Sequence, residues 1–211
     1  LRLQAQAAQL RFRPADAAAA LRALVELVPH DVDAWIALVD SELDALQGAA
    51  ARRTLARLTA LSVSSADPRL DLLRARLALL DNDQVQANTA ASHAMQQAVA
   101  HELPELALLA AGVQADALQQ QGDIGGAARL LEQADAHWSA RASNHSVLSL
   151  RLRQVQLLRA AGQLAPAAAL LEPLQALATT PSSQARIAIE RAQLQIGTGQ
   201  STSATRTLQA V

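Results

Sequence analysis

Apolar and small residues recur three and four residues apart along most of this chain, which is the spacing of amphipathic helices. In the stretch 32–47, at about 100° per residue, one face collects the large apolar residues Trp35, Leu38, Val39, Leu43 and Leu46. Each such stretch is followed by a short polar break and then by a second stretch. The pattern predicts antiparallel pairs of helices, each with one buried face and one face in water.

The polar breaks resemble one another. After Gly122, Gly162 and Gly199, a small alanine comes five residues later and a large apolar residue nine residues later. This spacing predicts a helix end, a tight turn and a new helix that packs closely on the previous one. When the earlier breaks are placed at Pro14, Gly48 and Asn82, successive turns lie 34, 34, 40, 40 and 37 residues apart. Helix pairs that recur at this period build helical solenoids.

We therefore expect an all-α superhelix of about six helix hairpins that forms a single repeat domain over residues 1–211. Because the first residue is leucine rather than methionine, we expect the chain to be a fragment of a longer polypeptide. Loose linkers are expected at 62–68 and 179–183, and the second helices of the fourth and fifth hairpins are expected at 124–142 and 164–178. The expected hairpins span 1–29, 31–62, 67–102, 104–142, 146–178 and 184–211.

The chain resembles the tetratricopeptide repeat (TPR) superfamily over essentially its whole length. The segment Asp33-Ala34-Trp35-Ile36-Ala37-Leu38 is similar to the opening of a TPR, a tryptophan followed three residues later by leucine, and the segments after Gly122 and Gly162 resemble the second-helix signature. The chain departs from the family pattern where a small residue or a tyrosine is usual, at Val39, Glu42, Arg74 and Leu77. The resemblance implies a TPR-like solenoid that binds a peptide or a partner protein in a concave groove. The longer second-half repeats resemble arrays attached to bacterial transcription factors and kinases.

Composition supports the helical prediction and removes some classes of function. Alanine, leucine, glutamine and arginine dominate, whereas β-branched and aromatic residues are scarce, so nearly all of the chain is expected to be helical. The formal net charge of −1 gives no electrostatic basis for binding nucleic acid, and no long apolar run suggests membrane insertion. Arginine without lysine is typical of a GC-rich bacterial gene, and with no cysteine the compartment, bacterial cytoplasm or periplasm, stays open.

The sequence contains no pattern that carries catalysis. His30, Asp31 and Asp33 lie close together, but they stand at a helix start, where an aspartate that caps the helix is the preferred explanation over a metal site. No HExxH, GxSxG or phosphate-binding glycine loop is present. We therefore expect no catalytic, cofactor-binding or metal-binding residue, no cofactor and no enzymatic activity.

Charged residues supply the remaining candidates. If first helices of the hairpins line a concave groove, the charged positions of the second and third hairpins lie in it, and we expect a partner-binding surface made of Asp33, Asp40, Asp44, Arg69 and Arg76. The alternative is that the acidic and basic helices only neutralise each other, and the sequence favours this alternative. Glu42 and Arg74 interrupt apolar faces, so they are expected either to form a partly buried ion pair across adjacent first helices or to reach solvent.

The leading functional prediction is an interaction scaffold for a protein or peptide partner. Two narrower roles stay open: a sensory or effector module of a bacterial transcription regulator or kinase, and a periplasmic assembly protein for secretion or polysaccharide export. The last helix has no polar capping helix after it, so self-association through open solenoid ends is also expected.

Overall fold

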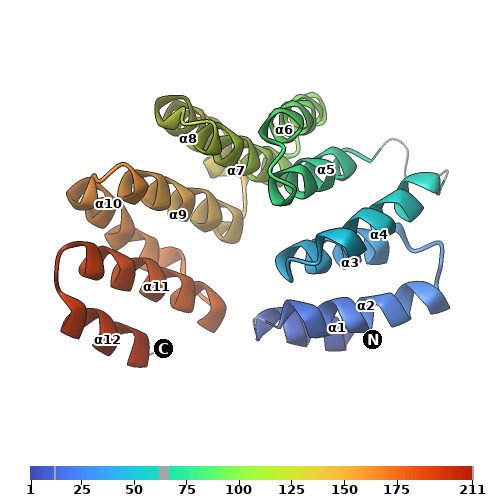
Figure 1. The fold of residues 1–211 in the computed structure, drawn as a ribbon, viewed down its shortest axis with the longest axis horizontal. Helices are drawn as coiled ribbons and strands as arrows, with labels where there is room; N and C mark the ends of the chain where they lie inside the picture. The colour runs from blue at the N-terminus through green and yellow to red at the C-terminus, as the bar shows by residue number, and fades with distance from the viewer. Residues whose placement is uncertain (12, 62–66, 211) are drawn as a thin grey trace. The chain divides into compact units, whose positions relative to one another are not determined.

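The computed structural model describes residues 1–11, 13–61 and 67–210, and within these ranges it contains helices and turns but no strand. The helices fall into two compact units, Leu1–His101 and Glu102–Val211 (Figure 1). Over the residues that the structure describes, each unit consists of three antiparallel helix hairpins. The predicted fold class, an all-α solenoid of helix hairpins, is confirmed. The prediction of one repeat domain over the whole chain stays a prediction.

In its described residues the first unit contains six helices in three successive hairpins. Within it α3 packs against α2 and α4, and α5 packs against α3, α4 and α6, so that each hairpin covers the apolar face of the one before. Two clusters of buried side chains form its core, one around Leu21 and Leu38 and the other around Val39, Leu58 and Leu73. The six helices are α1 (Arg2–Leu10), α2 (Pro14–Leu27), α3 (Val32–Asp44), α4 (Gly48–Ala60), α5 (Arg69–Leu80) and α6 (Gln84–Ala100).

The second unit repeats this plan. Helix α9 packs against α7, α8 and α10, and α11 packs against α9, α10 and α12. Alanines and one glycine on α7 are buried, which allows neighbouring helices to approach closely. The elements are α7 (Pro104–Gln120), α8 (Ile124–Trp138), the 3-10 turn η1 (Ser139–Arg141), α9 (Asn144–Ala160), α10 (Leu164–Leu171), the 3-10 segment η2 (Glu172–Leu177), α11 (Pro181–Gly197) and α12 (Ser201–Gln209).

One residue in each of five hairpin turns has left-handed backbone geometry. In three turns it is a glycine, as the sequence predicts, with φ of 86°, 74° and 79° at Gly122, Gly162 and Gly199. In the third hairpin it is Asn82, and in the second it is Leu46, with φ of 57°. The predicted turn at Gly48 was therefore wrong. Gly48 is the first residue of α4, where a β-carbon would lie only 3.1 Å from Leu80 of α5.

Two predicted boundaries in the second unit were also wrong, and proline explains both. The helix after Gly162 does not continue to residue 178, because Pro173 has no N–H to donate; α10 ends at Leu171 and a 3-10 segment follows. The expected linker at 179–183 belongs largely to α11, where Thr180 caps the helix and Pro181 is its first residue. Of the other expected linker, residues 62–66 lie outside the described residues.

Candidate functional site

The five charged residues predicted to form a binding surface come together on the first helices α3 and α5. Arg69 forms an ion pair of 2.9 Å with Asp33, and Arg76 bridges Asp44, at 2.6 Å, and Asp40. We call these five residues the α3–α5 charged surface. Its members neutralise one another across the two helices, which is the alternative that the sequence favoured over a binding surface. Whether they also bind a partner stays a prediction.

The carboxylates around this surface differ in proton affinity. Burial raises the pKa of Asp40, and the nearby charge of Asp44 adds to this effect, although Arg76 opposes it. Burial alone would raise the pKa of Asp67 as well, but hydrogen bonds from the guanidinium and the amide of Arg69 outweigh it and lower the pKa below 3.8. Arg69 therefore holds carboxylates on two sides, Asp33 on α3 and Asp67 just before α5.

The predicted ion pair between Glu42 and Arg74 was wrong. Glu42 is 1% exposed and accepts a hydrogen bond of 2.8 Å from Arg22 of the preceding second helix, α2. Arg74 instead pairs with Asp71 on its own helix at 2.6 Å. The buried glutamate does link neighbouring hairpins, but it does so toward the N-terminal neighbour.

The first helices of the second unit carry a similar set of polar contacts, which the sequence reasoning missed. Arg153 of α9 reaches α7, where it pairs with Asp116 and donates to the carbonyl oxygen of Gly112 at 2.9 Å. Between α9 and α11, Arg186 donates to Ser149 at 3.0 Å, and the amide of Gln156 donates to Glu190 at 2.6 Å.

These contacts could have been found by counting residues back from the turn that follows each first helix. Residues that stand thirteen positions before the left-handed turn residue, or six positions before it, recur in these interhelical contacts. The thirteen-position set is Asp33, Arg69, Ser149 and Arg186, and the six-position set is Asp40, Arg76, Asp116 and Gln156. Because seven residues are about two helical turns, both sets follow one stripe on the first helices.

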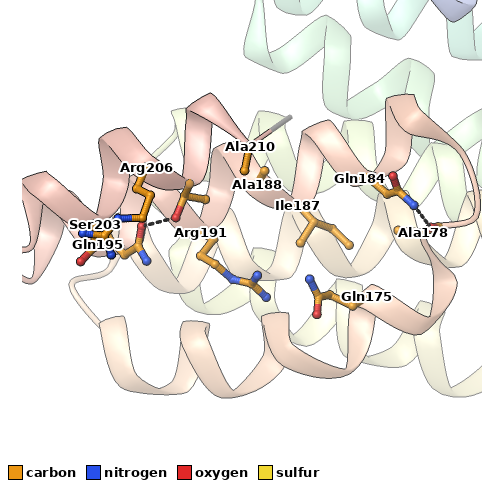
Figure 2. A pocket seen from close by; sticks show the side chains of 11 residues that line it. Gln175, Ala178, Gln184, Ile187, Ala188, Arg191, Gln195, Ser203, Arg206 and Ala210 are labelled. Carbon is orange, nitrogen blue, oxygen red and sulfur yellow. Dashed lines mark hydrogen bonds between the residues drawn. The ribbon is translucent and has the colours of Figure 1, made fainter.

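Three grooves of similar construction lie beside the second helices. Each has a first helix as its floor and the second helices before and after it as its walls. The first groove, about 600 Å³, lies among α2, α3 and α4; the middle one, about 520 Å³, among α8, α9 and α10. The last groove, about 770 Å³, lies among η2, α11 and α12 and is shown in Figure 2.

The grooves occupy equivalent repeat positions but differ in chemistry. All three are lined by the residue four positions before the turn and by the residue eight positions after it, namely Glu42 and Thr54, Leu158 and Leu170, and Gln195 and Thr207. The first groove combines arginines with glutamates, and the middle one is mostly apolar with two acidic residues. The last groove has two arginines and no acidic residue.

The structure also tests the expectations about helix capping, metal binding and membrane insertion. Asp31 caps α3 by accepting a hydrogen bond of 3.1 Å from the amide of Ala34, which confirms the capping prediction. The described ranges hold no group of three or more histidine, aspartate or glutamate side chains arranged to ligate a metal ion. None of the helices in the same ranges combines the length and hydropathy needed to cross a bilayer.

Comparison with known proteins supports the fold. No model of a known protein family matches the sequence, and a search of curated proteins finds no match. Among solved structures, the chain is similar to one from a functional characterization of PilF from Pseudomonas aeruginosa, a TPR-containing protein. The TM-score is 0.57 at 16% sequence identity, and the alignment covers 96% of this chain and 85% of the PilF chain. The fold is TPR-like.

Proposed function

We propose that this protein is a non-enzymatic scaffold that binds a peptide or a partner protein along the first helices of its hairpins. The observation that carries the proposal is the α3–α5 charged surface. Five charged side chains from two adjacent first helices gather there, and most of them remain substantially exposed to solvent. The TPR-like fold is consistent with such a role, because helical repeats present extended surfaces made of successive helices.

The chemistry of the surface fits exchange of partners. Exposed ion pairs contribute about 0–1 kcal/mol each, since water competes for both charges. An incoming peptide with charged side chains can replace Asp33 or Asp44 as the partner of an arginine at little cost to the fold. Electrostatic complementarity of this kind contributes mainly specificity and association rate.

Affinity capture followed by a binding measurement tests the proposal. Proteins retained by the immobilised 211-residue chain are identified, and the affinity of the purified partner is then compared between the natural chain and Asp33→Asn/Asp44→Asn. Asp16→Asn is the control for loss of an exposed carboxylate, because Asp16 forms an exposed ion pair with Arg13 outside this surface. We expect the double variant to strengthen binding by about tenfold, because it removes two carboxylates that compete with the peptide for Arg69 and Arg76. Equal affinity for all three proteins would remove the α3–α5 charged surface from the proposal.

The narrower roles follow only from the resemblance of the repeats. A regulator or kinase module requires a winged-helix or kinase domain next to these repeats in the parent gene, and a periplasmic assembly protein requires an export signal there. The sequence of the parent gene distinguishes the two roles.

A further inference from the structure

The last groove, among η2, α11 and α12, differs in charge from the other two grooves. Arg191 of α11 and Arg206 of α12 line it, and none of its lining residues is acidic. Its floor is apolar, formed by buried Ile187 and Ala188. A lining with two cations and no anion favours acidic ligands.

Neither arginine is firmly paired within the chain. Arg206 forms no hydrogen bond or ion pair with the residues that the structure describes. Arg191 lies 3.8 Å from Glu172, which is within ion-pair range but too long for a hydrogen bond, and the Glu172 side chain is 72% exposed. A carboxylate from a ligand can therefore replace Glu172 with little competition.

Amide side chains also line the groove. Gln175 of η2 and Arg191 of α11 point toward one another in Figure 2, and Gln184 of α11 lies at the far end, where its amide donates a hydrogen bond of 3.3 Å to the carbonyl oxygen of Ala178. Side-chain amides both donate and accept hydrogen bonds, as a peptide main chain requires. Guanidinium groups form two parallel hydrogen bonds with a carboxylate, which makes arginine a selective group for acidic side chains.

We propose that this groove binds an acidic segment of a partner protein. Arg191 and Arg206 hold glutamate or aspartate side chains of the segment, the glutamines hold its main chain, and Ile187 contacts its aliphatic portions. The site lies in the second unit and shares no residue with the α3–α5 charged surface, so the two proposals succeed or fail separately.

The chain offers a matched control for arginine. Arg129 stands seven positions after Gly122, and Arg206 stands seven positions after Gly199, so both occupy the same place on a second helix. Arg129 is exposed and does not line any of the three grooves. Substitution of Arg129 therefore changes the net charge of the protein by the same amount without changing the site.

Fluorescence anisotropy with a labelled peptide of six glutamates, and with six glutamines as the uncharged probe, tests the proposal. We expect the glutamate peptide alone to bind, and its affinity to fall as salt is added. Arg191→Gln and Arg206→Gln should each weaken binding by about fivefold or more, whereas Arg129→Gln should change it by less than about twofold. Arg206→Lys should retain part of the affinity, because it keeps the charge but loses the paired hydrogen bonds. Circular dichroism of each variant shows whether its helices are intact.

Methyl NMR locates the bound peptide. The glutamate peptide should shift the methyl signals of Ile187, beneath this groove, and leave those of Ile124, in the middle groove of the same unit, in place. The proposal is overturned if the glutamate peptide does not bind, if Arg129→Gln weakens binding as much as Arg206→Gln, or if Ile187 does not respond. Tighter binding of inorganic phosphate than of the peptide would also overturn it, because the site would then select a small anion.

Discussion

Two glutamates lie almost fully buried between helices, Glu42 between α2 and α3 and Glu190 between α9 and α11. Each faces an arginine, Arg22 at 2.8 Å and Arg159 at 3.5 Å, and each has one carboxylate oxygen without a hydrogen-bond partner in the described part of the chain. The arginines stay partly in water, with side-chain exposures of 49% for Arg22 and 32% for Arg159, so each pair removes mainly its carboxylate from water. The cost of that burial is about as large as the attraction gained, so such pairs add little net stability. In this protein each pair joins neighbouring hairpins.

The Glu42 pair leads to a mutational prediction. Arg22→Ala leaves a buried carboxylate without its cation and should lower the free energy of unfolding by about 1–3 kcal/mol. Glu42→Leu removes the charge and fills a similar volume, so we expect its stability to lie within about 1 kcal/mol of the natural chain. The double variant Arg22→Ala/Glu42→Leu should also lie within about 1 kcal/mol of the natural chain, since it leaves no buried carboxylate without its cation. Urea denaturation measures all three.

The exposed pair Arg52–Asp81 provides the control for this series. Arg52→Ala should cost less than about 1 kcal/mol, because both side chains remain in contact with water. If Glu42→Leu proves more damaging than Arg22→Ala, the buried pair is stabilising in itself and the explanation by an unpaired carboxylate is wrong.

Asp67 and Asp40 give opposite predictions for the effect of pH. The folded-state pKa of Asp67 is lowered, so its contribution is present above its ordinary value of 3.8 and is lost as pH falls through the folded pKa. Asp67→Asn should therefore cost about 1 kcal/mol at pH 7 and progressively less in acid below pH 3.8. The folded-state pKa of Asp40 is raised, so the natural chain should gain stability relative to Asp40→Asn as pH falls toward 3.8. Denaturation of the natural chain and both variants from pH 7 to below pH 3.8 measures how the stability difference for each variant changes with pH. As the pH falls, the natural chain should lose its advantage over Asp67→Asn and gain stability relative to Asp40→Asn, and changes of the same sign would contradict the prediction.

At the scale of the elements, the five left-handed turns show how the same hairpin accepts different residues. Glycine adopts positive φ without strain and asparagine does so with little strain, whereas for leucine this geometry costs roughly 1–2 kcal/mol of strain energy. Leu46 nevertheless occupies this position with 75% of its surface exposed, so burial of its side chain returns little. The second hairpin therefore contains a local strain that the fourth, fifth and sixth hairpins avoid.

Replacing that leucine should stabilise the protein. Leu46→Gly removes the strain but increases the freedom of the unfolded chain, and the net gain should be about 0.5–1 kcal/mol. The reverse change, Gly122→Leu, adds a β-carbon that would meet no atom within 4 Å, so we attribute its expected loss of about 1 kcal/mol or more to backbone strain. Thermal denaturation of the two variants measures both effects. A loss of stability in Leu46→Gly would show that the exposed leucine makes contacts that outweigh the strain.

These turns also show what the sequence could and could not predict. Glycine at a fixed distance from an alanine located three turns correctly, because glycine is the residue that left-handed geometry favours. Leu46 was missed for the same reason: leucine gives no such signal, and Gly48 stands two residues later. Pro173 was visible in the sequence, but its effect on α10 depends on a missing N–H that a pattern of apolar residues does not record.

The candidate sites were also predictable only in part. The charges of the α3–α5 charged surface were found because helical spacing places them on one side of each helix. The partner of Glu42 was not, since the choice between Arg22 and Arg74 depends on which neighbouring helix lies nearer to it. The three grooves were also missed, because they arise from the spacing between second helices, which no single helix encodes.

At the scale of the molecule, both units follow the same plan of hairpins that cannot bury their apolar faces alone. Each unit has its own core, around Leu58 and Leu73 in the first and around Leu152 and Leu171 in the second. In an array of this kind, stability is close to a sum over hairpins and their contacts with neighbours. Within the first unit α1 packs mainly against α2, and within the second unit α12 packs mainly against α11.

Self-association of the 211-residue chain is the prediction that belongs to this scale. Helix α1 exposes Leu3 and Leu10, and α12 exposes Leu208, so apolar side chains of both outer helices are in water. Burying them against a second copy would remove apolar surface from water at about 25 cal/mol per Å². We expect sedimentation velocity to show a weight-average mass that rises with concentration, and Leu3→Gln/Leu10→Gln/Leu208→Gln to reduce that rise. Val85→Gln, which changes an exposed apolar residue of α6, is the control and should leave the rise unchanged. A constant monomeric mass at every concentration would exclude association through these helices.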